Sequence, residues 1–211
     1  MAVYVFFFIS GYLVAQSWER KRGPFDFAAK RVGRIYPGLI VSTLFSVVVI
    51  GALVTTVPLS AYWGDRGTWL NLANNMAGIS TVQVLPGVFE HNPFARAVNG
   101  SLWTIRYELL MYAMLGLMAW VCAQRHRWAY AVCADALALI WWVGSTQGWP
   151  AARPRWTGWL LETWSPAQIT MLGVYFFIGS AFARLRVRHH WGWGWLGVLA
   201  LIGARSGTQQ Q

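Results

Sequence analysis

The chain has 211 residues, of which 56% are apolar and only 11% are charged, whereas soluble domains have roughly 45–50% apolar and about 25% charged residues. The 17 Lys and Arg residues give a formal net charge of +10 and occur in short clusters between apolar runs. This pattern is typical of loop charges that orient a membrane protein and not of a face that binds nucleic acid. The composition therefore predicts an integral membrane protein without a nucleic-acid partner.

The first apolar run covers residues 1–18 and ends at a sharp step in charge. It is long enough for a spanning helix, which needs about 17–25 residues. Ser10 and Gly11 interrupt the run with small side chains, which allow another helix backbone to approach closely. On the residues alone, we interpret this pair as a packing notch in preference to a ligand contact.

Residues 19–34 form a polar, mainly cationic segment that we interpret as a link between the first two spans. The positive-inside rule places this link on the cytoplasmic side. Lys30, Arg31 and Arg34 are three and four residues apart, so on a helix they project from one face and suit the binding of one anion. Pro37 fits the first turn of a second span, residues 37–57.

Residues 67–89 carry no charge but contain several polar side chains and a proline. A lipid-facing helix with this content is costly. We therefore predict a buried half-helix or a re-entrant segment here, and the sequence leaves open whether it crosses the membrane.

Four further spans are predicted at residues 101–123, 128–144, 163–183 and 191–204. The predicted fold class is thus all-α, a polytopic bundle of about six transmembrane helices with a possible re-entrant segment. We expect one partial domain over residues 1–204 and a polar tail over residues 205–211.

Glu108 is the most informative ionisable residue of the predicted third span. It is four residues from both Thr104 and Tyr112, so the three side chains share one helix face. An ionisable group within a span is a functional hypothesis because its burial is costly. Pairing with a cation, such as nearby Arg106, explains Glu108 equally well, and both interpretations stay open.

Arg31 and Arg34 also allow two interpretations. Cationic clusters beside a span are most often orientation signals or lipid-headgroup contacts. Their three-residue spacing just before Pro37 also presents two guanidinium forks, which match phosphate geometry. No cluster of residue types in the sequence predicts a metal site.

Three segments in fixed order resemble the membrane-bound acyltransferase 3 family, which contains bacterial O-acyltransferases that modify surface and exported polysaccharides. These are residues 5–13 (VFFFISGYL), 30–37 (KRVGRIYP) and 99–108 (NGSLWTIRYE). The resemblance implies an enzyme of the bacterial inner membrane. It would move an acyl group, usually acetyl, from acyl-CoA on the cytoplasmic side to a hydroxyl of a polysaccharide or lipid-linked glycan.

The resemblance also implies roles for individual residues. Lys30, Arg31 and Arg34 would bind the acyl-CoA donor, and Glu108 would support catalysis. The substrate cavity would be lined by Ser10, Gly11, Asn99, Trp103, Thr104 and Tyr112.

The sequence departs from the family pattern at one important point. Family members carry an essential histidine on the helix before the segment that resembles residues 5–13, and no histidine here occupies that place. We therefore expect an incomplete chain with little or no acyltransferase activity by itself. The alternative from another class is a membrane transporter or glycan-export subunit without enzymatic activity.

Overall fold

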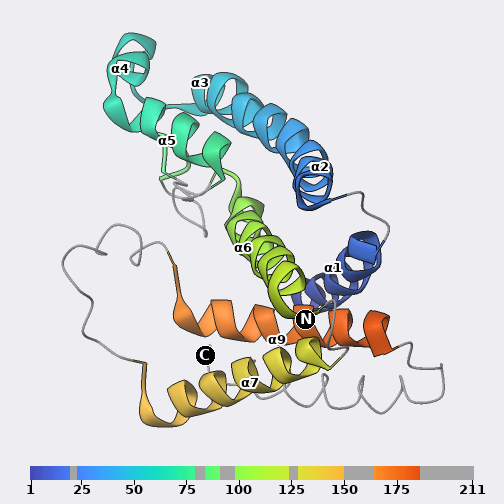
Figure 1. The fold of residues 1–211 in the computed structure, drawn as a ribbon. Helices are drawn as coiled ribbons and strands as arrows, with labels where there is room; N and C mark the ends of the chain where they lie inside the picture. Colours follow the sequence, from blue (N-terminus) through green and yellow to red (C-terminus); the bar gives the residue numbers. More distant parts are fainter. Residues whose placement is uncertain (20–22, 79–83, 91–97, 124–127, 150–163, 186–211) are drawn as a thin grey trace. The chain divides into compact units, whose positions relative to one another are not determined.

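In the computed structural model, the described residues are 1–19, 23–78, 84–90, 98–123, 128–149 and 164–185 (Figure 1). They form helices and connecting turns and contain no strand, which confirms the predicted all-α class. The helical elements are α1 (Ala2–Glu19), α2 (Pro24–Leu44), η1 (Phe45–Gly51), α3 (Ala52–Val54), α4 (Leu59–Gly64), α5 (Arg66–Ala77), η2 (Gly100–Leu102), α6 (Trp103–Met118), η3 (Ala119–Ala123), α7 (Ala129–Gln147) and α9 (Pro166–Leu185).

Residue contacts divide the chain into two compact units. Unit 1 comprises Met1–Phe27 and Met111–Gln211, and unit 2 comprises Ala28–Leu110. Helices α2 and α6 each contribute residues to both units.

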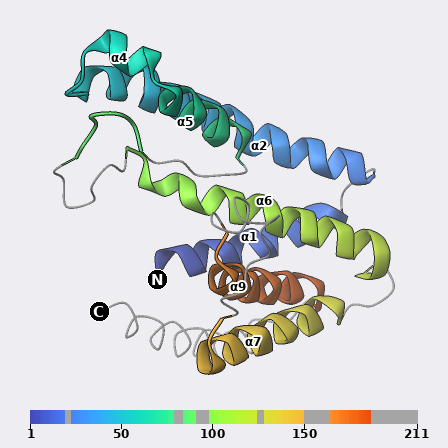
Figure 2. The same ribbon diagram turned by 90° about the vertical axis from the view of Figure 1, so that its left-hand side faces the viewer.

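In unit 1, α9 packs against both α1 and α7 and lies between them (Figure 2). Two glycines make the contact with α1 possible. A Cβ at Gly11 would collide with the carbonyl oxygen of Phe176, and a Cβ at Gly179 would collide with that of Phe8. The Ser180 hydroxyl also donates a hydrogen bond to the Gly11 carbonyl oxygen at 3.1 Å. The packing interpretation of the Gly11 notch is therefore confirmed.

One long helical rod, Pro24–Val54, lies in unit 2 except for its first turn, and its seven-residue π-helical segment is η1. The prediction of a polar link up to residue 34 was wrong, because the helix already begins at Pro24. Pro37 consequently lies inside α2 and not in its first turn. A proline leaves the carbonyl four residues earlier without its helical partner. That residue is Gly33, which is exposed, so the free carbonyl lies at the surface.

The π-helical segment packs in a small core with α4 and with the turn that contains Leu85 and Val88. Val47, Tyr62, Leu85 and Val88 are buried together in this core. The Tyr62 hydroxyl donates to the Val47 carbonyl oxygen at 2.8 Å, and a Cβ at Gly51 would collide with that hydroxyl. Burial raises the pKa of the Tyr62 phenol, which keeps this donor protonated.

Residues 67–89 do not form one continuous helix. Helix α5 ends at Ala77, and Gly78 follows it in the left-handed conformation with a φ of 70°. At about 1.5 Å per residue, a helix of 12 residues is much shorter than a bilayer core of about 30 Å. The half-helix part of the prediction is confirmed, and whether the segment re-enters or crosses stays a prediction.

Three helices in the described part are long and apolar enough to cross a membrane, namely Pro24–Val54, Ala129–Gln147 and Pro166–Leu185. They correspond to the predicted second, fourth and fifth spans. The shorter apolar helix Ala2–Trp18 and helix α6 occupy the predicted first and third spans. The predicted sixth span, residues 191–204, lies outside the described residues.

The substitution Gly11→Ala tests the contact between α1 and α9. We expect it to destabilise the fold by about 1–3 kcal/mol, because the added methyl group must displace the α9 backbone. Gly38→Ala is the matched control, since no atom lies within 4 Å of a Cβ built there. Thermal unfolding in detergent, followed by circular dichroism, measures both variants, and equal melting temperatures would contradict the packing role.

Candidate functional site

The three predicted donor-binding cations all lie on α2 in unit 2. Arg31 is half-buried, whereas Lys30 and Arg34 are exposed. The helical spacing assumed for them is thus correct, and they lie near one another on the helix surface. The arrangement places two guanidinium groups and one ammonium group close together on α2.

Asn99 is the N-cap of η2, the short 3₁₀ helix that leads directly into α6, where Glu108 lies. Its side-chain oxygen accepts hydrogen bonds from the Ser101 backbone N–H at 3.2 Å and from the Ser101 hydroxyl at 2.6 Å. These bonds cap the first turn, because an asparagine side chain at this position replaces a missing helical acceptor. Asn99 therefore has a structural role in addition to its predicted place in the cavity.

Aromatic contacts follow along α6. The rings of Trp103 and Tyr107 meet edge to face with centroids 5.9 Å apart. The Arg106 guanidinium lies 4.9 Å from the Tyr107 ring centroid and donates to the Tyr107 hydroxyl at 3.3 Å. Glu108 comes next and is buried, with 9% of its surface exposed. The costly burial of this carboxyl group fits either interpretation given above.

The hydroxyls predicted beside Glu108 have hydrogen-bond partners of their own. Thr104 donates to the Ser101 carbonyl oxygen of the preceding turn at 3.2 Å. The Tyr112 hydroxyl lies 3.1 Å from the Ser10 hydroxyl and hydrogen-bonds with it in unit 1. Of the predicted cavity residues, the structure thus brings Ser10 and Tyr112 together, while Asn99, Trp103 and Thr104 lie in unit 2.

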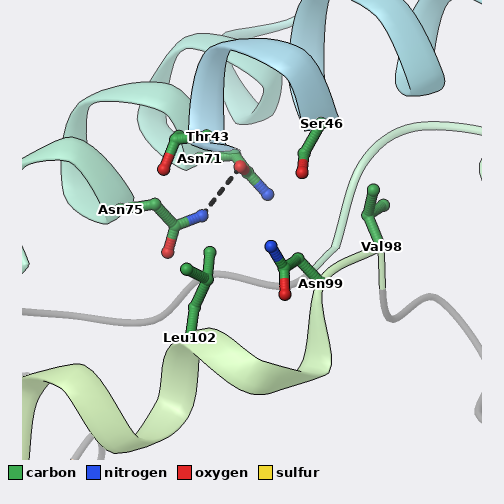
Figure 3. Close-up of a pocket in the computed structure, with 7 residues that line it drawn as sticks. All are labelled: Thr43, Ser46, Asn71, Asn75, Val98, Asn99 and Leu102. Atoms are coloured by element: carbon green, nitrogen blue, oxygen red, sulfur yellow. Dashed lines mark hydrogen bonds between the residues drawn. The ribbon is translucent and has the colours of Figure 1, made fainter. Parts of the chain in front are cut away.

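A polar pocket in unit 2 is lined by the predicted cavity residue Asn99 and by six residues that the sequence did not single out as a site (Figure 3). Three segments form it: the end of α2 with η1, helix α5, and the start of η2 with the residues before it. Its lining residues are Thr43, Ser46, Asn71, Asn75, Val98, Asn99 and Leu102. The pocket contains no ionisable side chain and is dominated by amides and hydroxyls.

Hydrogen bonds hold the two asparagine side chains that α5 contributes to this pocket. Asn75 donates from its side-chain nitrogen to the Asn71 side-chain oxygen at 2.9 Å (Figure 3). Asn71 in turn donates to the Val84 carbonyl oxygen at 3.1 Å. The four-residue spacing on α5 aligns the two amides. With the Asn99 side-chain oxygen bound to Ser101, the Asn99 side-chain nitrogen points into the pocket (Figure 3).

One polar atom of the pocket lining is not accounted for. Thr43 is 1% exposed, and its hydroxyl has no hydrogen-bond partner among the described residues. Buried hydroxyls in native proteins are nearly always hydrogen-bonded, and an orphan costs about 1–3 kcal/mol.

The sequence held a signal for this pocket. Asn71 and Asn75 belong to the polar side chains of residues 67–89 that make a lipid-facing helix costly, and Thr43 and Ser46 are polar residues three apart within an apolar span. Such spacing indicates one polar helix face turned away from lipid. No group of three or more His, Cys, Asp or Glu side chains that suits a metal ion occurs in the part of the chain that the structure describes.

Comparisons with known proteins define the class to which this helical membrane protein belongs. A model of an acyltransferase domain matches residues 1–207, which is nearly the whole chain and includes both units. The chain therefore belongs to the acyltransferase 3 family. This confirms the resemblance of the three sequence segments.

The chain is similar to a protein of Shigella phage Sf6 named "O-acetyl transferase". The two are 29% identical over 117 residues, which are 56% of this chain and 34% of the phage protein. The chain thus matches about a third of the length of this curated relative. No solved structure matches the chain.

The substitution Tyr62→Phe tests the support of the π-helical segment beside the pocket. We expect a loss of about 1–3 kcal/mol, because the buried Val47 carbonyl oxygen loses its hydrogen-bond donor. Tyr12→Phe is the matched control, since Tyr12 is exposed. Chemical unfolding in detergent measures the two variants, and equal midpoints would contradict a structural role for this hydrogen bond.

Proposed function

We propose that the chain is part of an integral-membrane O-acyltransferase that uses acyl-CoA, with acetyl as the acyl group, and acts on a hydroxyl of a polysaccharide or lipid-linked glycan. The observation that carries the proposal is the family match over residues 1–207. Similarity to a phage O-acetyl transferase and the cationic start of α2 support it. The bacterial inner membrane is the proposed location, with Arg31 and Arg34 on the cytoplasmic side.

The donor site is proposed on α2. Coenzyme A carries a pyrophosphate and a further phosphate, and guanidinium groups bind such oxygens through paired, charge-assisted hydrogen bonds. Arg31 and Arg34 are one turn apart, and Lys30 adds a third cation at the exposed surface. A helix that fixes these positions lowers the entropic cost of gripping a flexible anion.

The reaction determines what other groups are needed. The acceptor oxygen forms an ester bond with the acyl carbon, the thioester C–S bond breaks, and coenzyme A leaves as a thiol. The proton of the acceptor hydroxyl must pass to a base, and charge develops on the acyl oxygen. Glu108 is a buried carboxyl group in the same unit as the proposed donor site, and we assign it a supporting role in this transfer.

The variants Arg31→Ala and Arg34→Ala test the donor site. We expect each to weaken binding of acetyl-CoA by about tenfold or more, since a charge-assisted hydrogen bond contributes about 1.5–3 kcal/mol. The control is Arg66→Ala, which removes an exposed arginine at the start of α5. Equilibrium binding of labelled acetyl-CoA to the chain in nanodiscs measures all three. Unchanged affinity in both site variants would contradict the proposed grip.

The variant Glu108→Gln tests the supporting carboxylate. We expect any residual acyl transfer from acetyl-CoA to a glycan by this chain to slow by about tenfold or more, because an amide cannot accept a proton. The affinity for acetyl-CoA should stay the same. Glu90→Gln, at an exposed glutamate, is the matched control. A Glu108→Gln variant that binds donor and transfers acyl groups at the parental rate would show that Glu108 only stabilises the helices.

A further inference from the structure

The pocket beside the π-helical segment has the chemistry of a binding site for a neutral hydroxyl group. Thr43 and Ser46 contribute hydroxyls, and Asn99 turns its side-chain nitrogen into the space (Figure 3). Thr43 is 1% exposed, and its buried hydroxyl has no partner in the described part of the chain. A group that enters the pocket can therefore satisfy an atom for which the described residues provide no partner.

The dimensions of the pocket limit what can enter. Its empty volume is about 220 Å³, part of which is open to solvent. The cavity volume is only about 10 Å³. That is the room for one water molecule or one hydroxyl group. A whole sugar ring cannot be enclosed, but one of its hydroxyls can be inserted.

The lining distinguishes among the chemical groups of an acyl-transfer reaction. A phosphate needs cationic side chains, and none lines this pocket. An acyl chain needs an apolar lining, whereas five of the seven lining residues are polar. A hydroxyl both donates and accepts, so it fits a mixed set of amide N–H groups and hydroxyls. Val98 and Leu102 provide apolar surface for the C–H groups of a ring at the entrance.

Local backbone geometry supports a functional interpretation. Ser46 lies in η1, and π-helical segments inside α-helices occur frequently at functional sites. The Tyr62 hydroxyl donates to the carbonyl oxygen of Val47, the residue after Ser46 in this segment. Ser46 and Asn99 both line the pocket (Figure 3). Two helices and a capped turn thus pre-organise the pocket.

We propose, building on the acyltransferase function above, that this pocket is an acceptor subsite that takes one neutral hydroxyl of the glycan. The Asn99 side-chain nitrogen donates to the sugar oxygen, and the sugar hydroxyl bonds in turn with Thr43 and Ser46. The subsite recognises a hydroxyl that anchors the sugar, and it is separate from the cationic donor site on α2. It therefore contributes to the choice of sugar and to the orientation of the sugar.

Direct binding of sugars tests the subsite without relying on turnover. The complete chain in nanodiscs is titrated with the methyl glycosides of glucose, galactose and mannose and with their monodeoxy analogues, followed by saturation-transfer NMR. The site variants are Thr43→Val and Ser46→Ala. The matched controls are Thr146→Val and Ser42→Ala, whose hydroxyls donate to carbonyls of their own helices outside the pocket.

We expect at least one methyl glycoside to bind the parental chain and to bind both site variants about tenfold more weakly, with both controls unchanged. One deoxy analogue should bind the parental chain as weakly as the parent sugar binds Thr43→Val. Thr43→Val should bind the parent sugar and this deoxy analogue equally weakly. The hydroxyl removed from the protein and the hydroxyl removed from the sugar are each other's hydrogen-bond partners. Thr43→Val should also unfold at an equal or higher temperature, since it removes an unsatisfied buried hydroxyl.

Other outcomes would overturn the proposal. Binding that is equal in the parental chain and in Thr43→Val, or no binding of any glycoside, would mean that the pocket holds an ordered water only. Acetyl-CoA binding is measured on the same nanodiscs to separate the two proposals. Sugar binding that depends on Thr43, in a chain that does not bind acetyl-CoA, would contradict the proposed acyltransferase function and support the sugar subsite. Acetyl-CoA binding without sugar binding that depends on Thr43 would support the acyltransferase function and contradict the sugar subsite.

Discussion

The constraint on which this structure depends is that polar groups within an apolar environment must find partners inside the protein. Backbone groups meet it by forming helices, which is why every regular element among the described residues is helical. Side chains meet it by bonding to backbone carbonyls or to each other. Ser180 bonds to the Gly11 carbonyl and Thr170 to that of Pro166, so neither hydroxyl is left open in α9.

The same constraint explains why Thr43 is exceptional. Threonine hydroxyls in helices normally bond to a carbonyl one turn earlier, as Thr146 does in α7. Thr43 makes no such bond within the described residues although it is buried. Thr43, Ser46 and Asn99 line the same pocket, and the space between their side chains is not filled by the described residues. The proposed sugar hydroxyl would supply the partner that the described residues do not give to this buried hydroxyl.

Sequence patterns predicted the positions of several helices because long apolar runs end at charges. Helices α1, α7 and α9 begin and end within a few residues of the predicted spans. The start of α2 was missed because residues 24–34 are too polar for hydropathy to distinguish a helix from a link. The pocket could not be assembled from sequence, since Asn99 meets Thr43 only through folding, and their separation of 56 positions has no periodic signature.

The position of the two proposed sites on one helix also explains how a strongly cationic protein can keep a neutral pocket. Thr43 lies nine residues after Arg34 on α2, which corresponds to about 14 Å along the axis at about 1.5 Å per residue. Nine residues are also about two and a half turns, so the two side chains leave the helix on opposite sides. The cations of α2 are therefore directed away from the pocket. A neutral hydroxyl can enter the pocket without competition from phosphates, which the cationic end of the same helix attracts.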